Sequence, residues 1–167
     1  MKDKRIQLTL FVDEKEAIEI EKLRKAFNPL QYKLIKSHVT LCREDELSQI
    51  EAIILKLKNT TLEAITINFG SPIRFSNGNG VLIEAIGDNL QFHNLRKNIL
   101  NGHIEKAKIQ EPHITLMHPR NATCTDEIFS FIAQASLPTQ IRFDKISLIQ
   151  QEMGMKWHIL EEFELND

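Results

Sequence analysis

Apolar residues recur along this chain at two different spacings. In residues 5–12, aliphatic side chains occupy every second position, and this period of two predicts a strand. Residues 13–27 carry apolar side chains at helical spacing, and Asn28-Pro29 ends the predicted helix. Asp13 suits an N-cap, and Glu16 stands where it would complete a capping box. The chain is therefore expected to open with a strand followed by a helix.

The alternation between strands and helices continues through the first half. A second strand is predicted at residues 33–42, a helix follows, and residues 61–69 form a third strand. The apolar stripe of that helix consists of Leu47, Ile50, Ile54 and Leu57.

The second half repeats this order about 75 positions later, with little identity between side chains. It comprises a strand at 81–87, a helix at 88–102, a strand near 110–120, a helix at 124–136 and a strand at 139–150. The last helix is expected to bury Ile128, Phe131 and Ala135. Five elements in one register indicate two similar α/β lobes related by a pseudo-two-fold axis.

We predict a single domain over residues 1–167, with a lobe-level repeat at approximately 5–75 and 80–150. The segment "GSPIRFSNGNG" is expected to be the loop that joins the lobes, since its Asn-Gly pairs are typical of tight turns. A further strand is predicted at 155–165, paired as a hairpin with residues near 141–150.

A short motif occurs in both halves, as "SHVTL" and "PHITL". Residues i and i+2 of a strand share a face, so His38 and Thr40 form one pair and His113 and Thr115 form another. One imidazole can accept a proton while another donates one, and threonine hydroxyls can donate to phosphoryl oxygens. If the lobes place the motif strands together, the sequence predicts metal-free, in-line chemistry at phosphorus.

The composition limits the partners and the cellular compartment that we expect for this protein. The 167 residues carry a net charge of −2 and are 42% hydrophobic, which argues against wrapping long nucleic acid. Cys42 and Cys124 have no metal-binding or redox spacing, so we expect a reduced, cytoplasmic protein. Neither a signal-peptide pattern nor an apolar run long enough for a membrane span is present, so no membrane association is expected.

The paired motifs, together with "LTLFVDE" at the start and "GMKWHILEEFEL" at the end, resemble the two-histidine (2H) phosphoesterase superfamily, the 2′-5′ RNA ligase-like group. The resemblance implies a bilobal α+β fold with two antiparallel-type sheets around a central groove that contains both motifs. It implies cleavage or formation of phosphodiester bonds at a 2′-oxygen, on cyclic phosphates or 2′,5′-linked nucleotides. It also implies His38 as general acid and His113 as base, an order that reversing the reaction exchanges.

Other residues are secondary candidates. Six side chains are expected near the groove, the cations as phosphate contacts and the aromatics as stacking partners for a base: Lys36, Arg43, Arg120, Lys156, Phe11 and Trp157. Cys42 shares the face of His38, but a buried thiol is the simpler interpretation. The remaining histidines are interpreted as structural or surface residues.

Two functions follow from these observations. The first is a cyclic phosphodiesterase, or another 2′-specific phosphoesterase, that acts on RNA ends or nucleotides without a cofactor or metal. The alternative is a module that binds RNA or nucleotides in the same groove without turnover. No obligatory protein partner is evident in either case.

Overall fold

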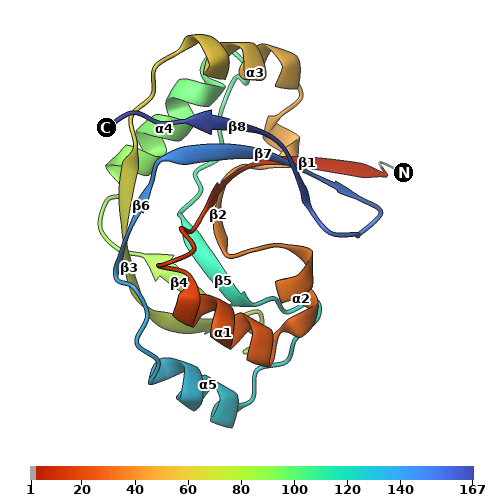
Figure 1. The fold of residues 1–167 in the computed structure, drawn as a ribbon, viewed down its shortest axis with the longest axis vertical. Helices are drawn as coiled ribbons and strands as arrows, with labels where there is room; N and C mark the ends of the chain where they lie inside the picture. Colours follow the sequence, from red (N-terminus) through yellow and green to blue (C-terminus); the bar gives the residue numbers. More distant parts are fainter. Residues whose placement is uncertain (1–2) are drawn as a thin grey trace.

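The computed structural model describes residues 3–167 and contains two four-stranded sheets (Figure 1). All pairings between the named strands are antiparallel. The first sheet has the order β2 (His38–Cys42), β1 (Lys4–Phe11), β7 (Lys145–Glu152), β8 (His158–Glu164). The second has the order β5 (His113–Met117), β4 (Gly80–Ala85), β3 (Ile65–Phe75), β6 (Gln140–Phe143).

Five α-helices and one short 3₁₀ turn accompany the sheets in the described residues: α1 (Ile18–Phe27), α2 (Pro29–Leu34), η1 (Glu44–Glu46), α3 (Ile50–Asn59), α4 (Leu90–Leu100) and α5 (Asp126–Ala133). In Figure 1, α3 and α4 lie at one end of the molecule, and α1, α2 and α5 lie towards the other. The predicted α+β class with two antiparallel sheets is confirmed.

The sheets exchange strands between the two halves of the chain. β3 belongs to the first half of the sequence but pairs with β4 and β6 of the second. In return, β7 and β8 extend the sheet that β1 and β2 begin. The lobe boundaries at 5–75 and 80–150 stay a prediction about the sequence repeat, because each sheet draws strands from both halves.

The joining segment is shorter than predicted. β3 continues to Phe75, so "GSPIRF" is strand, and only residues 76–79 turn the chain into β4. The register shifts between Phe69 and Pro72. Such an irregularity accommodates a proline, which has no N–H for the ladder. Ser76, Asn77 and Gly78 all have positive φ and close the turn.

The first helix begins later than predicted. α1 starts at Ile18, and Asp13 instead accepts a hydrogen bond from the Lys15 N–H within a preceding turn. The capping box with Glu16 is therefore wrong. Asn28-Pro29 does end α1, but Pro29 also starts α2, because its fixed φ suits the first position of a helix. This short helix delays the motif strand to His38.

The buried face of α5 differs from the prediction at Phe131, whereas Ile128 and Ala135 pack against the core as predicted. Ile132 is fully buried, whereas Phe131 is 62% exposed. The Phe131 ring packs edge-on against Phe27 of α1, with the centroids 5.5 Å apart. Because α5 lies at the outer end of the molecule, one face of it covers the core and the rest borders α1 and solvent (Figure 1).

Buried polar side chains tie the two motif strands together. Arg96 of α4 donates to the Leu41 carbonyl of β2, to both carboxylate oxygens of Glu46, and to the Lys108 carbonyl in the segment before β5. Gln110 donates to the Thr40 carbonyl at 2.9 Å. These contacts span both sheets and hold β2 beside β5.

A third tie lies at the far end of β5. Asn28 is fully buried between α1 and α2, and its side-chain oxygen Oδ1 accepts a hydrogen bond from the backbone N–H of His118 at 2.8 Å. Its amide nitrogen donates to the side chain of Asn121 at 2.8 Å. The residues that end the first helix thereby fix the end of the second motif strand.

Replacing Arg96 with Met should lower the free energy of unfolding by about 3–5 kcal/mol, because the buried Glu46 carboxylate would lose its counter-charge. Urea unfolding measures this change. The control is Lys22→Ala, which removes an exposed ion pair with Glu19 and should cost at most about 0.5 kcal/mol. Equal small losses in both variants would contradict the proposed role of Arg96.

Candidate active site

The two His-x-Thr pairs lie on adjacent strands at the meeting edge of the two sheets. β2 and β5 are the edge strands of their sheets and contact each other. The aliphatic residues between and after the motif residues are buried: Val39, Leu41, Ile114 and Leu116. His38, Thr40, His113 and Thr115 are only partly buried on the opposite face. The backbone therefore presents two imidazoles and two hydroxyls in one region.

Both imidazoles are oriented by the same backbone contact. The Nδ1 of His38 lies 2.8 Å from the Lys36 carbonyl, and the Nδ1 of His113 lies 3.4 Å from the Glu111 carbonyl. A carbonyl only accepts, so each Nδ1 carries a proton and donates it. In the neutral ring, Nε2 then has a free lone pair. The two rings share a tautomer suited to proton transfer at Nε2.

The electrostatic environment of His38 keeps its ring neutral. Burial lowers the pKa of His38 to about 4, and the positive charges of Arg24 and of His113, when it is protonated, act in the same direction, while the bond to the Lys36 carbonyl opposes them. Arg24 is itself buried and donates to the Ile35 carbonyl. His38 is therefore an available proton acceptor at neutral pH.

The strands beside the two motifs present different side chains. Phe11 is paired with His38, and their ring centroids lie 6.1 Å apart in an edge-on contact. At the equivalent place in the other sheet, Glu84 is paired with His113. The backbone repeat therefore gives one histidine an aromatic neighbour and the other an acidic one.

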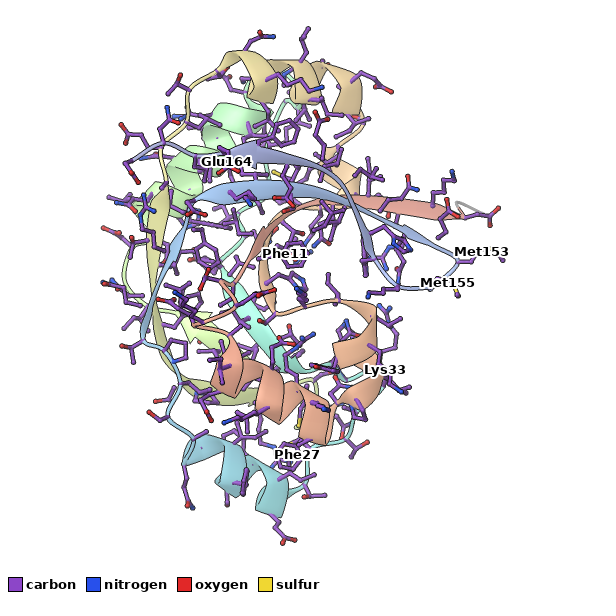
Figure 2. The ribbon with its side chains drawn as sticks, viewed as in Figure 1. Phe11, Phe27, Lys33, Met153, Met155 and Glu164 are labelled. Atoms are coloured by element: carbon purple, nitrogen blue, oxygen red, sulfur yellow. The ribbon has the colours of Figure 1, made fainter. Side chains whose placement is uncertain are left out.

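A groove of about 690 Å³ runs along the first sheet, and none of the four motif residues is among the residues that line it. Two of its lining residues, Phe11 and Lys36, contact His38. Phe11, Lys36, Lys156 and Trp157 line it, with the Ser147 side chain of β7. Figure 2 shows Phe11 at the inner side of the arch formed by β1 and β7. The backbone N–H of Trp157 donates to the Leu34 carbonyl, and the guanidinium of Arg5 lies over the indole ring at 5.4 Å. Four of the six secondary candidates thus surround one cavity large enough for a nucleoside.

The other two secondary candidates do not line this groove. Arg43 precedes η1, where its backbone N–H donates to Glu46. Arg120 follows β5, and its backbone N–H donates to the His118 ring. Neither cation borders this cavity.

Cys42 is fully buried, and burial raises the pKa of its thiol to about 12. A thiol in that state is a poor nucleophile, as the sequence interpretation expected.

The sequence did not identify two polar residues on the site face. Gln7 of β1 lies two residues before Thr9 and hydrogen-bonds the Thr40 hydroxyl. Alternation along β1 places Gln7 on the face of Phe11, and that was the available signal. Arg24 had no such signal, because a basic residue in an amphipathic helix is normally expected in solvent.

Within residues 3–167, no three His, Cys, Asp or Glu side chains gather in a way that could hold a metal ion. Over the same residues, no helix has the length and apolarity needed to cross a membrane.

The sequence matches the 2′-5′ RNA ligase superfamily over residues 11–154. The chain belongs to this family. The resemblance to the 2H phosphoesterases, drawn from the paired motifs, is thereby confirmed. No curated protein is similar enough in sequence to count as a match.

Solved structures share the fold at low sequence identity. LigT of E. coli complexed with phosphate is 15% identical with a TM-score of 0.68, and the match covers 98% of each chain. LigT complexed with 3′-AMP is 14% identical with a TM-score of 0.69, over 98% of this chain and 99% of that one. TT0787 of Thermus thermophilus is 18% identical with a TM-score of 0.60, over 96% and 97%.

Lowering the pH should destabilise the protein through His38. An unfolded histidine titrates near 6.5, so between pH 6.5 and about 4 the unfolded state binds more protons at this position than the folded state does. Stability should fall across this window, and less so in His38→Gln. Urea unfolding of both proteins at the two ends of this pH window gives the loss of unfolding free energy in each. NMR follows the titration of the His38 ring directly. An ordinary titration midpoint for His38 would refute this account.

Proposed function

We propose that this protein is a cytoplasmic, metal-independent phosphoesterase. Its proposed substrates are 2′,3′-cyclic phosphates or 2′,5′-phosphodiesters of RNA ends or nucleotides. The observation that carries the proposal is the pair of histidines on adjoining strands, each with Nδ1 on a backbone carbonyl and Nε2 left for chemistry. In-line displacement at phosphorus needs a base near the attacking oxygen and an acid near the leaving oxygen. Two imidazoles of matching orientation meet that need.

In the hydrolytic direction, His38 acts as base and His113 as acid. The lowered pKa of His38 leaves it neutral and able to take a proton from water. His113, in its imidazolium form, then donates the Nε2 proton to the departing ribose oxygen. Exchange with solvent afterwards removes the proton from His38 and returns one to His113. This order is the reverse of the one that the family resemblance implies. Ligation would use the same two groups with their roles exchanged.

The threonine hydroxyls hold the phosphoryl group in this mechanism. Each lies two residues after its histidine and on the same face. Hydroxyl donors that contact non-bridging oxygens stabilise the charge that these oxygens carry in the transition state.

The groove along the first sheet takes the nucleoside of the substrate, because Phe11 and Lys36 of its lining contact His38. Phe11 and Trp157 offer aromatic faces for a base, and Lys156 offers positive charge. Lys36 lines the same groove and is ion-paired with Glu14. LigT, which shares the fold, has been solved with phosphate and with 3′-AMP. Those complexes support a substrate that combines a phosphate with a nucleoside.

Replacing either motif histidine should reduce kcat for a nucleoside 2′,3′-cyclic phosphate by about 10²–10⁴, because one proton transfer loses its catalyst. A chelator should leave the wild-type rate unchanged. The matched control is His103→Ala, a histidine that follows α4 and contacts Gln49. Steady-state product formation in His38→Ala and His113→Ala provides the measurement.

Two results would refute this function. Full turnover in a His38→Ala, His113→Ala double variant would exclude the paired-histidine mechanism. Saturable nucleotide binding with no product from cyclic phosphates or 2′,5′-dinucleotides would support the non-catalytic binding module instead.

Replacing Trp157 with Ala should raise KM for nucleoside cyclic phosphates by about five- to a hundredfold, since base stacking on an aromatic ring contributes about 1–3 kcal/mol. The Kd for inorganic phosphate should not change, because phosphate has no base. Met155→Ala is the control, as this exposed side chain lies on the same hairpin (Figure 2). An unchanged KM in Trp157→Ala would place the base elsewhere.

A further inference from the structure

Thr40 and Thr115 occupy matching positions in the two motifs but have different neighbours. Thr40 pairs with Thr9 of β1, whereas Thr115 pairs with Leu82 of β4. Two residues before these partners, β1 carries Gln7 and β4 carries Gly80. Of the two threonines, only Thr40 is therefore paired directly with a polar residue on the neighbouring strand.

The amide of Gln7 contacts two hydroxyls. Its Nε2 lies 2.7 Å from the Thr9 Oγ1 and 3.2 Å from the Thr40 Oγ1. A primary amide nitrogen carries two N–H groups, so each hydroxyl oxygen can accept one of them. Thr9 is fully buried and anchors the amide from within the sheet. Thr40 receives the second contact.

This contact determines what the Thr40 hydroxyl can do. A hydroxyl has one hydrogen to donate and two lone pairs to accept with. Because the Gln7 N–H occupies a lone pair, the Thr40 hydrogen is directed away from Gln7 and is left for an acceptor. In the described part of the chain, no side chain hydrogen-bonds the Thr115 hydroxyl, whose hydrogen is not fixed in this way.

We propose that Gln7 is a positioning residue that holds the Thr40 hydroxyl as a hydrogen-bond donor towards a phosphoryl oxygen of the substrate. The inference rests on the proposed function, which places the phosphate between the two motifs. The phosphate site then has one pre-oriented donor, on β2, and one that orients only when the ligand arrives, on β5. Pre-orientation removes part of the ordering cost when the phosphate binds.

Double-variant cycles test this role. Gln7→Leu is made in the wild type, in Thr40→Val and in Thr115→Val. The two readouts are kcat for a nucleoside 2′,3′-cyclic phosphate and Kd for inorganic phosphate by calorimetry. Valine keeps the shape of threonine, and circular dichroism checks that each variant is folded.

The expected effect of Gln7→Leu depends on the background. In the wild type and in Thr115→Val, kcat and phosphate affinity should both fall by about two- to tenfold, the size of one ordinary hydrogen bond. In Thr40→Val neither should fall further, because the hydroxyl that Gln7 orients is gone. A merely structural role for Gln7 would produce the same loss in all three backgrounds.

Equal losses in all three backgrounds, or no loss in the wild type, would overturn the role of Gln7. Failure of the proposed function has a different signature, because phosphate binding does not require turnover. In that case the wild type would form no product, yet the phosphate affinities would still show coupling between Gln7 and Thr40.

Discussion

The guanidinium of Arg96 is buried where the two sheets meet, and the geometry of the site depends on it. It bonds β2 through the Leu41 carbonyl, the following turn through Glu46, and the approach to β5 through the Lys108 carbonyl. Two edge strands from different sheets have no ladder of their own to align them. The buried ion pair therefore sets the register of the two motifs, together with the hydrogen bond from Gln110 to Thr40.

The two His-x-Thr motifs have similar backbone contacts, but their histidines have different surroundings. Both histidines use Nδ1 on the carbonyl two residues earlier. Yet His38 lies beside Phe11 and is influenced by buried Arg24, whereas His113 is paired with Glu84. A symmetric pair of imidazoles would have no preference between accepting and donating a proton. Unequal surroundings supply that preference, and this supports different roles for the two rings.

The sequence predicted the parts of the molecule that follow local periodicity. Alternation located the motif strands, and the shared face of His38 and Thr40 follows from the pleat alone. It could not show that β3 crosses to the other sheet, because that depends on contacts distant in the chain. The start of α2 at Pro29 was missed although proline at the first helical position is a local signal.

The hydrogen bonds and ion pairs that connect distant elements could not be predicted from the sequence either. Arg24 and Arg96 appear as ordinary surface charges in an amphipathic helix until their partners, half-buried Glu21 and buried Glu46, are known. Gln7 could have been placed on the site face, but not its bond to Thr40.

The central claim is that both histidines serve a single phosphate. Titration with 3′-AMP, followed through the ¹⁵N signals of the two imidazole rings, tests it most directly. The account predicts that the Nε2 signals of His38 and His113 shift together and saturate at one ligand per chain. A shift at only one ring, or saturation at two independent ligands, would contradict it.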